Sequence, residues 1–429
     1  MQINGVLLLY HLPLTQDAPT ILENIRAYES NSRFKVWNVN TYFGFPASLV
    51  GMRFSAIGFH YSLFGNWPFA LNEDFLSYVD QSQSSYKVAL FQDEYQYCRP
   101  RFDFLNRCQV DCVYTLIEPQ YFKDVYEKFT SVPRIIHYLT GYVSDEMIDL
   151  AHRLTIPDEK RSIDIGYRAR SLPYYMGHGA QEKTEVAVEF QRRAAGLGLK
   201  LDIETDEQRR IYGAGWYDFV ANCRGMIGTE AGVSITDLTG EVRAECERLL
   251  ALNPQFTFAE MSKAFLHKWE DFIPQRVISP RHFEAAAFRV CQILYEGRYS
   301  GAMKPMVHYI PLRKDFSNFD ECLRLFQQKS VRDEITGNAY NDLIASGRYS
   351  YQSFIAGFDE VLGDAGLEPL PNSGDADAAL RQMSRELRWL ELRSKKNKFI
   401  YSDFPGRRPL AALGGPLLRA LRRLKGRVA

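Results

Sequence analysis

The sequence predicts an α/β protein of two domains, each built on a parallel sheet, that face one another across a cleft. Its 429 residues are too many for one ordinary hydrophobic core. Short apolar runs alternate with amphipathic stretches through most of the chain, and this alternation is typical of a parallel sheet covered on both faces. A polar, proline-containing stretch at residues 151–162 interrupts the pattern, and we expect it to link the two domains.

Each half of the chain contains its own series of candidate elements. In the first half, the candidate strands are residues 5–10, 34–38, 56–60, 86–92, 112–117 and 134–138. The candidate helices between them are residues 18–30, 72–83 and 119–129. In the second half, the candidate strands are residues 162–167, 199–204, 225–228, 290–295 and 307–312. The candidate helices there are residues 182–195, 319–328 and 331–345, followed by a loop-like stretch at 366–377 and a charged helix at 378–396.

Composition excludes some classes of protein. Lys+Arg and Asp+Glu both number 52, so the whole chain offers no net field for nucleic acid. The seven cysteines are scattered, and Cys108 and Cys112 have no second pair at zinc spacing, so we predict no metal site and a reducing cytoplasm. The apolar run at residues 3–14 lacks a basic leader and a cleavage site, and we interpret it as a buried strand. No stretch approaches the length of a membrane span.

The last 23 residues, 407–429, are basic. They contain seven Lys and Arg residues and no acid. On a helix that begins at Pro416, Leu417, Leu421, Leu424 and Val428 share one face. Such a tail suits an anionic membrane surface, and the alternatives are a disordered solubilising end or a helix that docks on the protein.

Three stretches of the second half resemble a known family. They are residues 163–183, residues 213–240, and residues 277–318 together with the downstream 339–362. They resemble the C-terminal domain of GT-B-type glycosyltransferases, and most closely the bacterial group-1-like and spore-maturation-protein-like members. The resemblance implies two Rossmann-like domains facing a cleft, and a transfer that usually needs no catalytic metal.

The resemblance also implies how the chain is divided. Residues 1–155 would form the Rossmann-like acceptor domain, and residues 163–365 the Rossmann-like domain for a nucleotide-sugar donor, with a UDP-sugar expected. Residues 366–429 would comprise a linker, a helix and the basic tail. Amide groups at helix N-termini bind phosphate, and a carboxylate can bind ribose hydroxyls, so acids, glycines and histidines at strand–helix junctions suit such a donor.

Basic and acidic residues of the second half are the first donor-binding candidates. Arg168 and Lys183 follow its first strand, where basic residues of related transferases reach the diphosphate. The alternative is a pair of solvated surface charges. Glu284 matches a family glutamate that binds ribose, although it is also suited to stabilise a helix N-terminus. The retaining branch has a second glutamate eight residues earlier, where this chain has Arg276, so the stereochemistry of transfer is left open.

Two glycine-containing turns supply further donor-binding candidates. In residues 228–234, hydroxyl, carboxylate and backbone groups follow an apolar strand, where open α/β sheets bind ligands. In residues 296–308, an acid and a glycine end another strand. The alternatives are an ordinary strand-to-helix turn and a structural histidine. The candidates in these two turns are Gly228, Thr229, Glu230, Ser234, Glu296, Gly297, Tyr299 and His308.

The catalytic base for an inverting transfer is expected in the first half. Asp93 and Glu94 end an apolar strand and so point toward the predicted cleft. Either one could deprotonate an acceptor hydroxyl as it attacks the anomeric carbon. His11 and His60 also follow strands and are rivals, and a structural role is the alternative for all four.

These observations predict a cytoplasmic glycosyltransferase, a transferase of bacterial surface polysaccharide or glycolipid biosynthesis. Its partners would be a nucleotide-sugar, a glycan or lipid-linked acceptor and, through residues 407–429, the inner membrane face as a peripheral protein. Two alternatives are open: a non-catalytic nucleotide-sugar binding protein, and a sugar-nucleotide epimerase on the same architecture. An epimerase needs no acceptor.

Overall fold

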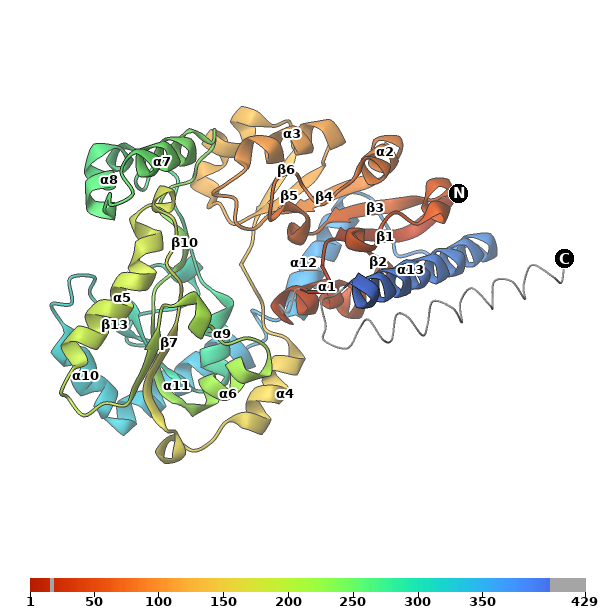
Figure 1. Ribbon diagram of the computed structural model, residues 1–429. Helices are drawn as coiled ribbons and strands as arrows, with labels where there is room; N and C mark the ends of the chain where they lie inside the picture. The colour runs from red at the N-terminus through yellow and green to blue at the C-terminus, as the bar shows by residue number, and fades with distance from the viewer. Residues whose placement is uncertain (16–18, 402–429) are drawn as a thin grey trace.

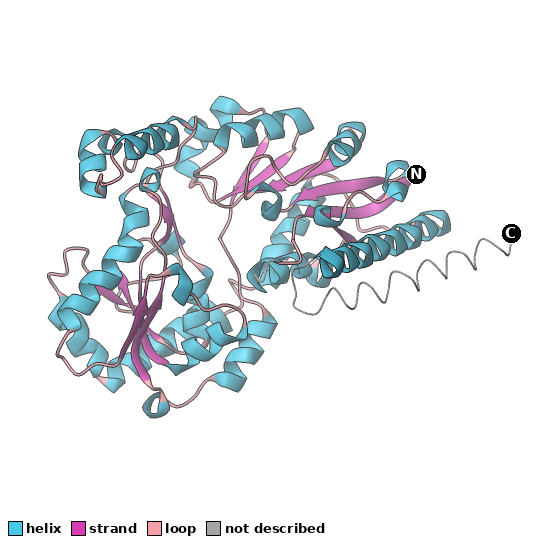
Figure 2. Cartoon of the chain, viewed as in Figure 1, coloured by secondary structure: helices cyan, strands magenta, loops and turns pink. Residues whose placement is uncertain are grey.

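The computed structural model describes residues 1–15 and 19–401, and the polypeptide forms two lobes (Figure 1). Each lobe has a sheet at its centre with helices around it (Figure 2). The basic tail at residues 407–429 lies outside the described residues. Among the described residues, no helix is both long and apolar enough to cross a membrane. In the same residues, no group of three or more His, Cys, Asp or Glu side chains is placed to hold a metal ion.

The first domain is built on a six-stranded parallel sheet with the strand order β2-β1-β3-β4-β5-β6. Alternate side chains of β1 enter the cores on opposite faces, with Leu7 and Leu9 on one face and Val6 and Leu8 on the other. The strand is therefore apolar throughout, as expected for a sheet covered on both sides. The strands are β1 (Gln2–Tyr10), β2 (Val36–Asn40), β3 (Arg53–Phe59), β4 (Tyr86–Leu90), β5 (Cys112–Thr115) and β6 (Arg134–His137).

Each predicted strand of the first half overlaps one of these strands. The helices of this half are α1 (Pro19–Asn31), α2 (Glu73–Gln81), α3 (Cys98–Cys108) and α4 (Asp145–Leu154). Helix α2 begins where the Asn72 side chain accepts a hydrogen bond from the Phe75 amide at 3.2 Å. The candidate helix at residues 119–129 is helical throughout, with a 3₁₀ turn at Pro119–Tyr121 that continues into a π turn at Lys123–Glu127.

The second domain has a five-stranded parallel sheet with the order β13-β12-β9-β7-β8. Counted along the chain, the second sheet follows the doubly wound order 2-1-3-4-5, and the first sheet follows the same order with a sixth strand added. Strand order therefore reverses between β1 and β3 in the first domain, and between β7 and β9 in the second. The strands are β7 (Ile163–Arg168), β8 (Leu201–Glu204), β9 (Cys223–Gly228), β12 (Cys291–Tyr295) and β13 (Ile310–Leu312).

A hairpin and several helices surround the second sheet. The strands β10 (Ala231–Val233) and β11 (Gln275–Val277) form a separate antiparallel pair that follows β9 in the chain. Helices α7 and α8 lie between these two strands in the sequence. These two helices were not predicted. Helix α7 lies toward α3 of the first domain, and α8 lies on the far side of α7 (Figure 1). The helices are α5 (His178–Ala194), α6 (Ala214–Asn222), α7 (Glu241–Leu252), α8 (Phe258–Ala264), α9 (Pro280–Ala287), α10 (Phe319–Gln327) and α11 (Lys329–Tyr340).

The chain returns to the first domain at its end. The aromatic face of α12 (Tyr351–Asp364) packs on α1, with the Phe358 and Tyr28 ring centroids 5.1 Å apart. Helix α13 (Gly374–Tyr401) then lies along the first domain beside β2 (Figure 1), and its Glu386 accepts hydrogen bonds from Ser48. The predicted boundary at residue 365 placed α12 with the second domain. The structure places it with the first, because its apolar face complements that of α1.

The two passages between the domains lie side by side. The amide of Val143, on the outgoing segment, donates to the Tyr349 carbonyl at 2.8 Å. The amide of Tyr351, on the returning segment, donates to the Val143 carbonyl at 3.0 Å. The two crossings are thus joined to each other by backbone hydrogen bonds at one place.

Candidate functional site

Two adjoining cavities lie where the carboxyl ends of the two sheets face each other. The second-domain cavity, about 300 Å³, is bordered by Gly228, Thr229 and Glu230 after β9 and by Lys183 on α5. The first-domain cavity, about 600 Å³, is bordered by residues that follow β1, β3 and β4. Both cavities therefore lie beside the reversals of strand order, where open α/β sheets bind ligands. Asp93 and Ala231 border both.

Basic side chains surround the second-domain cavity. Arg170, Lys183, Arg210 and Arg281 all border it. Arg281 donates to the Arg168 carbonyl at 2.5 Å, and its guanidinium lies 5.0 Å from the Trp216 ring centroid. Within the described part of the chain, neither Arg170 nor Arg281 forms an ion pair with a carboxylate. Cations without an acidic partner in a partly enclosed site attract an anionic ligand.

Lys183 is held inside this group of cations. Its Nζ donates to the Gly232 carbonyl at 3.2 Å. Burial, and then the positive charge of Arg276, lower the pKa of Lys183 to about 8. The ammonium is therefore predominantly charged at neutral pH and loses its proton in mildly alkaline solution.

Helix α9 places a neutral histidine beside these cations. Ser279 caps the helix by accepting a hydrogen bond from the Arg281 amide at 3.1 Å. The His282 Nδ1 accepts from the Ser279 amide at 3.0 Å, and burial lowers the pKa of His282 to about 3. Ser279, His282 and Ala285 all border the second-domain cavity, as expected for positions three apart on one helical face.

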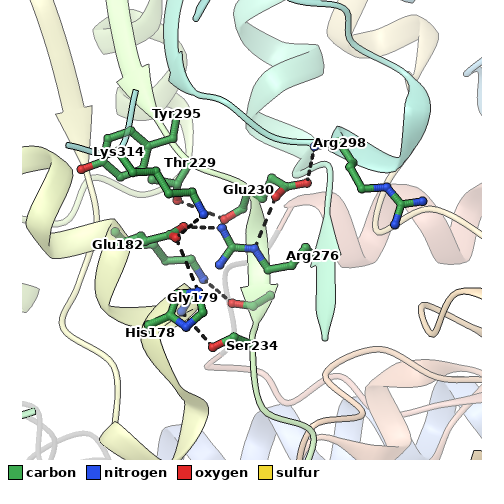
Figure 3. A network of polar contacts seen from close by, with 12 residues as sticks. His178, Gly179, Glu182, Thr229, Glu230, Ser234, Arg276, Tyr295, Arg298 and Lys314 are labelled. Atoms are coloured by element: carbon green, nitrogen blue, oxygen red, sulfur yellow. Dashed lines mark hydrogen bonds and ion pairs between the residues drawn. The ribbon is translucent and has the colours of Figure 1, made fainter. Parts of the chain in front are cut away.

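Glu230 borders this cavity and is fixed by several polar contacts (Figure 3). One carboxylate oxygen accepts the amides of Arg298 at 3.0 Å and Tyr299 at 2.8 Å. The other lies 3.4 Å from the Arg276 Nε. A β-carbon at position 297 would lie 2.8 Å from the Glu230 Cδ, so any residue larger than glycine would displace this carboxylate. The approach of a carboxylate explains this glycine, which does not itself border the cavity.

Behind Glu230, an ion network joins the hairpin to α5 (Figure 3). Arg276 also pairs with Glu182, which Lys314 approaches at 2.7 Å. Ser234 accepts the Gly179 amide at 2.9 Å and donates to Glu270 at 2.6 Å. Ser234 is therefore occupied at the start of α5 and does not border the cavity, contrary to its predicted donor contact.

Two predicted donor residues instead have structural partners outside the cavity. Arg168, the last residue of β7, pairs with Asp202 at 2.7 Å and lies 4.4 Å from the Phe219 ring centroid. Glu284 is buried and accepts the Trp216 indole N–H at 2.7 Å, and burial raises its pKa. Position 284 faces α6 because it lies on the side of α9 away from His282 and Ala285.

The predicted residues of the 296–308 segment also lie outside the cavity lining. Glu296 is exposed after β12. Tyr299 is fully buried, and its hydroxyl donates to the Tyr295 carbonyl at 2.6 Å. His308 accepts the Lys304 amide at 3.1 Å, and its other ring nitrogen lies 2.9 Å from an Asp342 oxygen. These groups stabilise the turn that supports Glu230.

In the first domain, the two acids after β4 point in opposite directions. Asp93 has a left-handed backbone with φ 52° and is exposed between the cavities. This conformation is rare for a non-glycine residue and is frequent at functional sites. Glu94 is 2% exposed and accepts hydrogen bonds from Thr115, Tyr126 and the Leu116 amide. Its predicted catalytic role does not fit this position, because every one of these partners lies in the core.

The two histidines of this domain also differ. His11 borders the first-domain cavity, with its Nδ1 3.1 Å from the Thr41 hydroxyl. His60 is fully buried, its ring nitrogens bonded to Ser62 and Asn24, and burial lowers its pKa to about 3. His11 thus has access to a ligand, and His60 does not.

Sequence reasoning missed most of the cations. Arg281 stands in the Pro-Arg pair at the start of α9, three residues before the predicted Glu284. Arg170 lies two residues beyond Arg168, and it reaches the cavity because the pairing of β7 with β8 ends at Arg168 and Glu204. The end of a strand is seldom fixed by sequence to within two residues.

No protein-family model matches the chain, and no curated protein matches it. Several solved structures are similar to it. One is an alpha-glucosyltransferase in complex with UDP and a DNA oligomer, with 8% identity and a TM-score of 0.48 over 84% of this chain and 99% of that one. HepE from Anabaena, in complex with UDP and glucose, has 13% identity and a TM-score of 0.42 over 85% and 100%. Sucrose-phosphate synthase from Thermosynechococcus elongatus has 10% identity and a TM-score of 0.45 over 85% and 99%.

The chain's own two sheets define its class. Two doubly wound parallel sheets, with their carboxyl edges facing adjoining cavities, confirm the predicted α/β fold of two Rossmann-like domains.

Proposed function

We propose that the protein is a glycosyltransferase that moves a sugar from a nucleoside-diphosphate sugar to an acceptor hydroxyl. The position of Asp93 carries the proposal. This carboxylate lies where a cavity rich in cations meets a second cavity lined mainly by neutral groups, both polar and apolar. A donor with a charged leaving group and an acceptor with a reactive hydroxyl suit such a pair of sites, with a base between them for an inverting transfer.

The second-domain cavity is the donor site in this proposal. Arg170, Lys183 and Arg281 would bind the diphosphate and stabilise the charge that develops on it as the glycosidic bond breaks. Glu230, anchored on its turn, would accept hydrogen bonds from hydroxyl groups of the sugar. We propose UDP as the nucleotide.

The first-domain cavity is the acceptor site. His11, Tyr61 and Gln92 border it and can orient a hydroxyl-rich molecule. Asp93 would take the proton of the attacking hydroxyl while its oxygen bonds to the anomeric carbon and the diphosphate leaves with the electron pair of the broken bond. Attack from the side opposite the leaving group inverts the configuration. We place this reaction in bacterial surface polysaccharide or glycolipid assembly in the cytoplasm.

The proposal is tested by donor binding and donor consumption. The protein is mixed with UDP, GDP, UDP-glucose and UDP-N-acetylglucosamine, and its thermal stability is measured. For the two UDP-sugars, the slow release of UDP that accompanies transfer of the sugar to water is also measured. We expect at least one nucleotide to raise the melting temperature, and Arg170→Ala with Arg281→Ala to abolish the rise. The matched control is Arg209→Ala, since Arg209 is exposed and outside the cavity lining. Absence of any shift would overturn the proposal, and binding without turnover would favour a non-catalytic binding protein.

A further inference from the structure

Helix α13 has a basic and apolar outer face. Its inner face, through Ala376, Leu380 and Met383, belongs to the core of the first domain. The opposite face carries side chains at the spacing of a single helical stripe, and all of them are exposed. This outer stripe consists of Arg381, Arg385, Arg388, Trp389, Leu392, Arg393 and Lys396.

Two large apolar side chains lie in the middle of the outer stripe. Trp389 and Leu392 are each 58% exposed, three residues apart on the same face. Water-exposed Trp and Leu surrounded by long basic side chains are typical of a helix that lies in a membrane interface. Arg393 lies with its guanidinium 5.3 Å from the Trp389 ring centroid, which leaves the cation at the border of the apolar patch.

Of the acids on α13, Asp377 borders a hollow together with Arg381 and Arg385, whereas Glu386 and Glu391 have partners outside the stripe. Glu386 accepts hydrogen bonds from the Ser48 amide at 3.0 Å and the Ser48 hydroxyl at 2.8 Å. Glu391 borders the hollow between α13 and β2 and raises the pKa of Tyr10 there, after the larger effect of burial. In the described part of the chain, Arg381, Arg385 and Arg388 have no carboxylate partner. The stripe is therefore strongly positive on a chain whose net charge is zero.

We propose that the outer stripe docks the protein on an anionic phospholipid surface. Residues 407–429, which contain seven cations and no acid, follow this helix in the sequence and suit the same surface. Their positive charge disfavours a tail that folds back over the stripe, and like charges equally disfavour pairing of two stripes in a dimer. A nucleic acid would leave the apolar centre of the stripe without a matching surface. An anionic lipid surface offers negative headgroups for the cations and an apolar region for Trp389 and Leu392.

Vesicle sedimentation of the full chain tests this inference, which does not depend on the proposed transfer. We expect binding to vesicles that contain phosphatidylglycerol and weak binding to phosphatidylcholine alone. Trp389→Ser with Leu392→Ser should reduce the affinity roughly tenfold through lost apolar burial. Arg385→Gln with Arg388→Gln should reduce it by a similar factor and lessen its dependence on salt. All four side chains are exposed, so the melting temperature should stay unchanged.

The matched control is Leu252→Ser with Phe272→Ser, because these side chains are 72% and 64% exposed on the second domain. Control binding should equal that of the natural chain. Equal binding by the stripe variants would mean that the tail acts alone, and this outcome would overturn the inference. Failure to bind anionic vesicles, or equal binding to neutral ones, would do the same. Duplex DNA binding that is lost in the stripe variants, with vesicle binding unaffected, would replace the lipid surface with a nucleic acid.

Discussion

The two cavities share a wall but differ in how they can recognise a ligand. The second-domain cavity presents Arg170, Lys183 and Arg281, which attract charge over a distance. The first-domain cavity presents mainly neutral groups such as Tyr61 and Gln92, which discriminate by shape and hydrogen bonding. One site is thus suited to a phosphate-bearing molecule, and the other to an uncharged hydroxylated one. Changes on either side should therefore have separable effects, which the following variants test.

The largest effect is expected at the shared wall. Asp93→Asn removes the proposed base but keeps the size of the side chain, so turnover should fall about 10²- to 10⁴-fold. Nucleotide affinity should stay within about twofold, since the cations are untouched. Steady-state kinetics and calorimetry measure the two quantities. Full activity of Asp93→Asn would remove this residue from the chemistry and leave His11 as the candidate.

A smaller effect is expected from one cation of the second-domain cavity. Arg281→Ala should weaken nucleotide binding about 10- to 100-fold, because a charge-assisted hydrogen bond to phosphate is lost. Binding of an uncharged acceptor should not change. Isothermal titration with UDP, with Arg209→Ala as the control, is the measurement. An unchanged affinity would show that this cavity does not hold the diphosphate.

The pH dependence should distinguish the cavities further. Below its pKa of about 8, Lys183 is charged and attracts phosphate; above it, the attraction is lost. Nucleotide affinity should therefore be steady near neutral pH and fall up to about tenfold as pH rises through 8. Lys183→Arg keeps its charge and should flatten this profile. The measurement is a nucleotide titration of the natural chain and of Lys183→Arg at several alkaline pH values. The same pH dependence in both proteins would contradict the prediction.

The smallest effect on binding is expected at Glu284. Its carboxylate accepts the Trp216 indole N–H and does not border the cavity. In Glu284→Gln the amide oxygen can accept the same bond, so the free energy of unfolding should change by only about 1 kcal/mol. Nucleotide affinity should be that of the natural chain. Chemical denaturation and titration test both, and a large loss of affinity would restore the ribose contact that the sequence suggested.

Sequence reasoning succeeded where a pattern extends over many residues. Alternating apolar runs located the strands of both sheets, since burial on two faces makes each run apolar throughout. Lys183, Gly228, Thr229, Glu230, Asp93 and His11 were predicted and do border the cavities.

It failed where a role depends on the direction of one side chain. Glu94 is one position from Asp93, and Glu284 is two positions from His282. Asp93 and His282 border a cavity, whereas the backbone geometry directs the side chains of Glu94 and Glu284 into the core. At Asp93 the left-handed backbone separates the exposed acid from the buried one, and no residue pattern reports that φ angle. Helix α12 was assigned to the wrong domain because it follows the second domain in the chain. Its place in the first domain depends on its packing against α1, which the sequence does not reveal.

The joined crossings near Val143 and Tyr351 make the connection between the lobes a single pivot. Away from it, the lobes are joined by polar contacts, among them Arg243 to the Tyr97 hydroxyl at 3.1 Å and Arg298 to Glu118 at 2.8 Å. They are also joined by apolar packing, since Ile273 and Leu238 of the second domain contact the core of the first. We expect any rotation of the lobes about the pivot to require that both kinds of contact are broken or rearranged. Asp93 and the cations belong to opposite lobes, so the distance between base and leaving group would be set by this rotation. Reactivity would then be withheld until both ligands draw the lobes together, which protects the donor from water.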